Sequence, residues 1–350
     1  MSRSDNDFLF ILGAGASMDF GFPSGMALME EIYCKWRDAH DEWIQLYLRI
    51  LRKAGKPAPF GDDLNIRKND ARKKIDELAN RLYYSGATSI DDFLSQVNDP
   101  EDKDFGKLTI IKLILGKEAG ALSMDPKKGL FKFSDNWLRI LFARVFRDEP
   151  FDKLKEKLKR NKIKFITFNY DRCLEHFLFQ GLKNYYNLSD EQAKEIFQEI
   201  FIDHVYGQLG NLDWQGNETG GVLNFGEKLG DKETEFDKIY RCKDNIKVIN
   251  EDRNNSKKYS QTINKASRVH MLGFGFDDAN LNLLELDQVE KIKNKFLYTT
   301  FGLSNSLKES IHKRFGKIYI GAAEQPGAVA YEKNICEYMF HDFSFDGKNN

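Results

Sequence analysis

Cysteine is scarce in this sequence of 350 residues, and its four copies lie far apart. The cysteines are Cys34, Cys173, Cys242 and Cys336. No two of them form the closely spaced pairs that zinc ribbons and disulfide frameworks require. Because there is also no secretory signal, we expect reduced thiols, no bound metal and a cytoplasmic location.

Long apolar runs are also absent, and neither sign of charge dominates. The run Phe8–Leu12 is too short for the core of a signal peptide or for a membrane span, and no other segment approaches such a length. Lys and Arg total 53, Asp and Glu total 54, and the net charge is −1. This balance argues against a dominant nucleic-acid-binding surface, and we interpret the charged residues 152–160 as a solvated helix face. We expect neither membrane insertion nor direct nucleic-acid binding.

Apolar residues make up 41% of the chain, which is enough for a large core. In the first half they recur at helical spacing. Helices are predicted at residues 24–51 with a break near 40, 70–84, 107–115, 135–146 and 151–159. Ser89 is expected to cap a further helix, with Asp92 at the capping-box position, and residues 55–63 are expected to form a loop. Residues 26–160 are therefore expected to form a helical insertion or subdomain.

Short apolar and β-branched runs predict strands in the rest of the chain. The predicted strands are residues 8–12, 163–168, 202–206, 222–225, 268–273, 295–301 and, at the sheet edge, 317–320. Helices are predicted between most of them, at residues 170–182, 190–201, 279–286 and 306–315. This alternation predicts an α/β fold, a doubly wound parallel Rossmann-like sheet with a large helical insertion. The sheet domain would comprise residues 1–25 and 161–342, and residues 343–350 would form a flexible tail.

A glycine-rich turn directly follows the first predicted strand. It consists of Gly13, Ala14, Gly15, Ala16 and Ser17. Glycines at a strand end let the backbone approach a pyrophosphate, and the next helix offers free N–H groups. A tight strand-to-helix turn is the alternative. Met18 stands where a dehydrogenase fingerprint has its third glycine, and no P-loop lysine follows.

Two further segments could complete a dinucleotide site. Phe22, Pro23 and Ser24 lie in a glycine- and proline-containing loop that would either cover a ligand or serve only as a loop. Gly273 and Phe274 follow the strand predicted to begin at 268. Two glycine turns in one sheet suit the two halves of a dinucleotide, which lie across the switch point of such a sheet.

Polar residues follow two other predicted strands. Thr167, Asn169 and Asp171 lie at the carboxyl end of the strand beginning at 163, and His204 lies in the strand beginning at 202. Ligands bind at the carboxyl ends of such strands. Asn169 or Asp171 could instead cap the following helix, and His204 could be structural or a general base.

Taken together and in order, these segments resemble the Sir2 superfamily. The matching segments are GAGAS at 13–17, GFPS at 21–24, TFNYD at 167–171, residues 204–207 and GFGF at 273–276. The helical block, with SIDDFL at 89–94, resembles a bacterial Sir2-like branch whose members destroy NAD⁺ in anti-phage defence. Three features depart from sirtuin deacetylases. The four-cysteine zinc module is missing, Ser24-Gly25-Met26 replaces Asp-Phe-Arg, and Tyr206 stands where the histidine usually precedes glycine.

The resemblance implies an NAD⁺ glycohydrolase that releases nicotinamide and ADP-ribose. Asn169 would hold the nicotinamide ribose, His204 would accept a proton, and Asp171 would stabilise positive charge. The turn at 13–17 would cradle the pyrophosphate, and Gly273 and Phe274 would contact the adenosine side. A protein deacylase or ADP-ribosyltransferase, or a non-catalytic NAD⁺ or ADP-ribose sensor, are the alternatives. We also expect a homo-oligomer and a separate regulatory partner, such as the ATPases or Argonaute-like proteins that accompany relatives.

Overall fold

A computed structural model describes most of the chain. The described residues are 7–56, 64–147, 149–160, 162–216, 221–230, 232–248, 256–286, 296–318 and 328–343. They form two compact units. The sheet unit comprises Met1–Gly21, Ala121–Val205 and Asp252–Asn350, and the helical unit comprises Phe22–Gly120 and Tyr206–Glu251. Each unit is described by itself.

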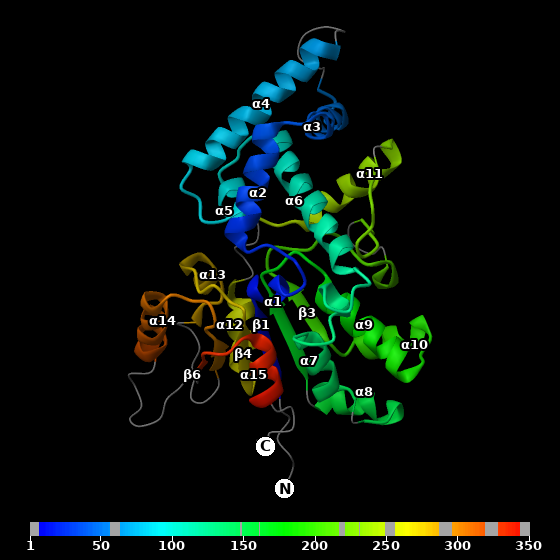
Figure 1. Cartoon of the computed structure of the whole chain (residues 1–350), viewed down its shortest axis with the longest axis vertical. Helices are drawn as coiled ribbons and strands as arrows, with labels where there is room; N and C mark the ends of the chain where they lie inside the picture. Colours follow the sequence, from blue (N-terminus) through cyan, green and yellow to red (C-terminus); the bar gives the residue numbers. More distant parts are fainter. Residues whose placement is uncertain are drawn as a thin grey trace. The chain divides into compact units, whose positions relative to one another are not determined.

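One parallel sheet forms the centre of the sheet unit (Figure 1). Its strands are β1 Phe8–Leu12, β2 Ile163–Thr167, β3 Phe201–His204, β4 Arg268–Leu272, β5 Phe296–Thr299 and β6 Ala328–Tyr331. Their order in the sheet is β3-β2-β1-β4-β5-β6. The chain moves from β1 to one edge and then returns beside β1 to build the other half. The topological switch point therefore lies between β1 and β4, and the predicted doubly wound α/β fold is confirmed.

The middle of the sheet is held together by stacked rings. Phe10 on β1 is in register with Phe165 on β2 and His270 on β4. Its ring centroid lies 5.1 Å from that of Phe165 and 5.0 Å from that of His270. All five residues of β1 are buried, as expected of a central strand covered on both faces.

Helices cover the sheet. They are α1 Gly15–Met18, α7 Trp137–Val145, α8 Phe151–Arg160, α9 Cys173–Tyr186, α10 Asp190–Phe197, α12 Ser256–Lys265, α13 Asp278–Leu283, α14 Asn305–Ile318 and α15 Ile335–His341, with a 3₁₀ turn at Gly129–Phe131. In Figure 1, α9 and α10 lie toward the β3 edge, and α13 and α14 toward the β6 edge. A capping box of Ser189 and Gln192 starts α10.

The helical unit has its own aromatic core. Its helices are α2 Gly25–Asp38, α3 Asp41–Lys53, α4 Leu64–Tyr84, α5 Ile90–Ser95, α6 Pro100–Ala121 and α11 Glu233–Cys242, with 3₁₀ turns at Asp213–Gln215 and Lys243–Asn245. Trp36 on α2 stacks on Phe105 of α6 at 5.4 Å and donates a hydrogen bond to Thr109. Ser89 caps α5, as predicted. None of the helices in the described ranges is long and apolar enough to cross a membrane.

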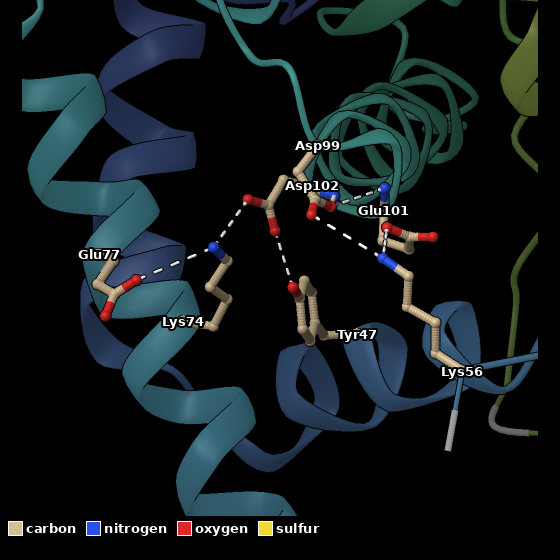
Figure 2. A network of polar contacts seen from close by, with 7 residues as sticks. All are labelled: Tyr47, Lys56, Lys74, Glu77, Asp99, Glu101 and Asp102. Atoms are coloured by element: carbon tan, nitrogen blue, oxygen red, sulfur yellow. Dashed lines mark hydrogen bonds and ion pairs between the residues drawn. The ribbon is translucent and has the colours of Figure 1, made fainter. Parts of the chain in front are cut away.

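A buried carboxylate joins three helices of this unit (Figure 2). Asp102, near the start of α6, is only 1% exposed. The Tyr47 hydroxyl on α3 donates to Asp102 Oδ1 at 2.7 Å, and Lys74 Nζ on α4 lies 3.3 Å from Oδ2. On the residue before Asp102, Glu101 Oε2 lies 2.5 Å from Lys56 Nζ. Because an unpaired buried charge is costly, each partner of Asp102 contributes to the packing of α3 and α4 on α6.

Two strand predictions were wrong and a third was shifted. Lys317 and Ile318 form the end of α14, in which the apolar residues Ile311 and Ile318 are spaced two helical turns apart. Residues 319–320 lie outside the described part. The sheet edge is β6 instead. Val222 makes a single bridge to Asn211 rather than a strand at 222–225. The strand predicted at 202–206 ends at His204 and so does not extend to Tyr206.

The compact units also divide the chain differently from the expected ranges. Residues 121–160, expected in the helical insertion, belong to the sheet unit because α7 packs against α9 and α15. Residues 206–251, expected with the sheet, belong to the helical unit. Phe343 is not part of a free tail, because it is 3% exposed and its ring lies 5.5 Å from that of Phe10. Residues 344–350 lie outside the described part.

Candidate functional site

The two glycine turns touch each other at the switch point of the sheet. The Gly15 amide donates a hydrogen bond of 2.9 Å to the Gly273 carbonyl. A Cβ atom on Gly13 would lie 2.5 Å from that oxygen, and one on Gly273 would lie 2.3 Å from the Ala16 nitrogen. Gly273 also has a φ of +57°, which favours glycine. The packing of the two turns therefore requires these glycines, whether or not a ligand binds.

Most backbone amides of the first turn are occupied by hydrogen bonds within the protein. Besides Gly15, the Gly13 amide donates to the carbonyl of Leu272, and the amides of Ala16 and Ser17 donate to carbonyls within the turn. Among the described residues of this turn, Ala14 alone has an amide without a hydrogen-bond partner. The predicted pyrophosphate cradle at 13–17 therefore offers a ligand one free amide.

Asn169 links the ends of β1 and β2. Its side-chain nitrogen Nδ2 donates to the Gly13 carbonyl and to Ser17 Oγ, both at 3.0 Å. Its backbone amide donates to Thr167 Oγ1 at 3.1 Å. No residue in the described ranges donates to the side-chain oxygen of Asn169. That oxygen is therefore available to a ligand.

Asp171 lies two residues further on and is 7% exposed. Its Oδ1 accepts the backbone amide of Cys173, the first residue of α9, at 3.1 Å, and its carboxylate also accepts the Ser17 hydroxyl. Burial raises the pKa of Asp171; the hydrogen bonds from Ser17 and Cys173 oppose this rise, and the nearby charge of Glu175 adds to it. Asp171 thus accepts the first amide of α9, although the N-cap residue of this helix is Arg172, and its side chain belongs to the same network as Asn169.

His204, the last residue of β3, makes contacts with both ring nitrogens. Nδ1 lies 2.8 Å from the backbone carbonyl oxygen of Asn169, and Nε2 lies 2.6 Å from Oε1 of Glu175. Glu175, in the first turn of α9, is 2% exposed. Burial alone would lower the pKa of His204, but the charge and hydrogen bond of Glu175, together with the Asn169 carbonyl and Asp171, raise it above the usual value.

These side chains line one small pocket inside the sheet unit. Its polar lining consists of Ser17, Thr167, Asn169, Asp171, Glu175 and His204. Its apolar lining includes Phe20 and Trp137, and the Trp137 Nε1 donates to the Ala16 carbonyl at 2.7 Å. Three polar residues of the sequence prediction, Asn169, Asp171 and His204, therefore meet in one place. Glu175 and Trp137 were not predicted, because neither lies in a glycine turn or at a strand end.

Four other predicted site residues, Phe22, Pro23, Ser24 and Phe274, are not part of this pocket lining. The Phe274 side chain is 2% exposed and packs edge-on against Phe168 at 5.1 Å, so it is part of the core. Phe22, Pro23 and Ser24 begin the helical unit, where the Ser24 hydroxyl caps α2 by accepting the Ala27 amide. Their expected place beside the ligand remains a prediction.

His270 is a second histidine of the sheet, in the middle of β4. It lies in the core between aromatic rings, and its Nδ1 is 2.5 Å from the Tyr338 hydroxyl. Burial, with a smaller contribution from Arg268, lowers the pKa of His270 to about 3. It is not part of the pocket lining.

No group of three His, Cys, Asp or Glu side chains within the described ranges is placed to hold a metal ion. No family model matches this sequence, and no curated protein matches it. The residues of the pocket and the motifs that contain them are therefore the basis for assigning a function.

Proposed function

We propose that this protein is an NAD⁺ glycohydrolase, an enzyme that cleaves the nicotinamide–ribose bond to give nicotinamide and ADP-ribose. One observation carries the proposal. Asn169, Asp171 and His204 join in one hydrogen-bonded network beside the two glycine turns, at the carboxyl ends of adjacent strands. The Sir2-like order of these motifs in the sequence supports the same substrate.

The polar groups suit a reaction in which a cationic ribose is attacked by water. Nicotinamide leaves as a neutral group, so the protein must hold the ribose, stabilise positive charge and accept a proton. The free side-chain oxygen of Asn169 would accept a hydrogen bond from a ribose hydroxyl or from the attacking water. His204 would take the proton of that water. The buried carboxyl of Asp171, in its ionised form, would stabilise the cation.

The two touching turns would hold the rest of the dinucleotide. The free amide of Ala14 would donate to a phosphate oxygen, and the backbone around Gly273 would lie beside the adenosine half. The contribution of the Phe274 side chain would be indirect, through its packing on Phe168.

The test is release of nicotinamide from NAD⁺ by the purified chain, followed by chromatography. Asn169→Ala should reduce release by at least about 10²-fold, because it removes the group that orients the ribose. Asn184→Ala is a matched control on α9, where Asn184 donates only to a carbonyl one turn back and is exposed. Near-normal release by a folded Asn169→Ala protein would contradict the assignment.

A second candidate is a non-catalytic sensor of NAD⁺ or ADP-ribose. It is favoured by the contacts of His204, whose two ring nitrogens are both engaged. A sensor would bind NAD⁺ in calorimetry and leave it intact. A deacylase or an ADP-ribosyltransferase would release nicotinamide only with an acylated or acceptor protein present, which the same assay distinguishes.

The resemblance also supports a biological setting. We propose a cytoplasmic effector of anti-phage defence that depletes NAD⁺, acts as a homo-oligomer and is controlled by a separate ATPase- or Argonaute-like partner. An unregulated enzyme of this kind would kill its own cell, so activity should rise when the partner is added. Light scattering of the pure chain and release assays with its genomic neighbour test these two points.

A further inference from the structure

The contacts of His204 limit where its protons can be. A backbone carbonyl oxygen accepts hydrogen bonds and has no proton to give. Because Nδ1 lies 2.8 Å from the Asn169 carbonyl oxygen, Nδ1 must carry a proton and donate it. The lone pair of the neutral ring is therefore on Nε2, and Nε2 faces Glu175.

A second proton must lie between Nε2 and Glu175. A carboxylate oxygen and an imidazole lone pair would repel each other at 2.6 Å, so the pair shares one proton. Because Glu175 raises the pKa of His204, we place this proton on the ring, which is then charged beside the carboxylate. In this state the ring cannot accept another proton until the pair has lost one.

Burial makes this pairing strong. The His204 and Glu175 side chains are 8% and 2% exposed. The other oxygen of Glu175, Oε2, is buried and has no hydrogen-bond partner in the described part of the chain. Glu175 therefore has His204 as its main polar partner, and a charge on either residue is stabilised chiefly by the other.

Few other charges face the ring. Asp171, which follows β2, raises the pKa of His204, as Glu175 does. Asp203, on β3 itself, is paired with Lys258 of α12 at 2.8 Å. The carboxyl of Glu175 is thus the charged group in direct contact with the imidazole.

We infer that Glu175 is a positioning residue that orients the His204 ring and sets the pH range in which His204 can accept a proton. The catalytic part of this inference rests on the proposed function. The pairing of Glu175 with His204 can be tested even if the protein shows no enzymatic activity. The active form would be the pair after loss of its shared proton. Repulsion between the carboxylate and the imidazole lone pair disfavours this form, so the rate should fall as pH falls and the pair becomes protonated. Water attack on the ribose cation would then transfer one proton to the pair, and solvent would remove it afterwards.

The direct test is the NMR titration of the His204 ring, assigned by comparison with His204→Gln. In the wild-type protein the ring should titrate above the usual histidine range. In Glu175→Gln, which keeps the shape of the side chain and removes its charge, the titration should move to lower pH, because burial then dominates. Asp203→Asn, which removes a neighbouring charge without touching the ring, is the control and should move it much less.

The kinetic test is the pH profile of nicotinamide release. The acid limb should move to lower pH in Glu175→Gln, and the plateau should fall by less than the roughly 10²–10⁴-fold loss expected for His204→Ala. A purely structural role for Glu175 would lower the rate without moving the limb.

The outcomes separate the two proposals. No nicotinamide release together with a shifted titration would overturn the proposed function and leave the pair intact. Release with an unchanged titration in Glu175→Gln would overturn the inference. If Glu175→Gln does not fold, the wild-type titration decides, because a ring that titrates below the usual range also overturns it.

Discussion

His204 is the residue where packing and chemistry compete most directly. Its ring is buried, which favours the neutral form, yet Glu175 favours the charged form. Tyr206 stands two residues further along the chain, but β3 ends before it, and a phenol is a poorer proton acceptor at neutral pH than an imidazole. The geometry leaves His204 as the better candidate.

Three single substitutions decide which residue is the base. His204→Ala should reduce nicotinamide release by about 10²–10⁴-fold while NAD⁺ affinity changes little, because binding depends on the glycine turns. Tyr206→Phe should reduce nicotinamide release much less. His270→Ala should lower stability rather than the rate per folded molecule, because His270 packs in the core. Release rates and calorimetric affinities, measured in parallel, give the ranking; a His204→Ala protein within a few-fold of wild type would remove His204 from the mechanism.

At this scale the sequence predicted the strand-end residues but not their partner. Asn169 and His204 follow apolar runs, so their place at one edge of the sheet follows from the α/β pattern. Glu175 is one of many glutamates on helices, and nothing in its own neighbourhood distinguishes it. Its importance comes from the pairing of β2 with β3, which brings His204 over the first turn of α9.

Among the elements, the turns after β1 and β4 approach each other so closely that a side chain on Gly273 has no room. Gly273→Ala should destabilise the protein by about 2–5 kcal/mol, since a methyl group would overlap Ala16 and Gly15 and the residue has a left-handed φ. Gly275→Ala is the control, because no atom lies within 4 Å of its added Cβ. Thermal or denaturant unfolding of both variants measures the difference. Equal stability of the two would show that the turns can move apart.

The buried carboxylate of the helical unit gives a second prediction. Tyr47→Phe should destabilise by about 1–3 kcal/mol, because Asp102 Oδ1 would lose its hydrogen-bond donor in a buried position. Tyr84→Phe, at a residue 81% exposed on α4, should change stability by less than about 0.5 kcal/mol. Urea unfolding of both proteins makes the comparison. A Tyr47→Phe protein as stable as the control would mean that water replaces the lost hydroxyl.

Element boundaries were predicted less well than element types. The break between α2 and α3 was predicted near His40, and the structure places it there. The end of β3 was misjudged because Val205 and Tyr206 are buried although they lie beyond the strand. An apolar pattern in the sequence indicates burial, not the backbone hydrogen bonds that define a strand. The strand predicted from residue 317 was wrong because a short apolar run fits a strand and the last turn of a helix equally well.

For the whole molecule, two buried histidines affect stability in opposite directions. The pKa of His270 is lowered to about 3, so between pH 6.5 and 3 the unfolded chain binds a proton that the folded protein excludes, and stability falls as pH falls. The pKa of His204 is raised, so its contribution is present below its unfolded pKa and is lost as pH rises through the folded value. His270 therefore lowers the free energy of unfolding as pH falls, and His204 lowers it as pH rises through its folded pKa.

The acid effect can be isolated. A double variant, His270→Phe with Tyr338→Phe, removes the ionising ring and the hydroxyl that contacts it. Its unfolding free energy should depend less on pH between 6.5 and 3 than that of the wild-type protein, by up to about 5 kcal/mol across the window. Chemical unfolding at several pH values measures the slope. Parallel pH profiles for the two proteins would mean that His270 takes up its proton in the folded protein as readily as in the unfolded chain.

The boundaries of the two compact units could not be predicted from the sequence. The described residues between 206 and 248 hold one α-helix, α11, and two 3₁₀ turns, so no long periodic pattern assigns this stretch to either half. Their place with residues 22–120 depends on contacts across long stretches of chain. Such contacts are a property of the folded molecule rather than of any local segment.

The touching glycine turns also constrain how this sequence can change over time. A crowded side chain is often accommodated when its neighbour becomes smaller, and a second substitution then restores the fold. A methyl group on Gly273 would overlap backbone atoms of Gly15 and Ala16, and one on Gly13 would overlap backbone atoms of Gly273 and Phe274. Because shortening a side chain removes no backbone atom, no second substitution within the contact can relieve the first. A genetic screen for suppressors of Gly273→Ala should therefore recover revertants or distant stabilising changes, and none at Gly13 or Gly15.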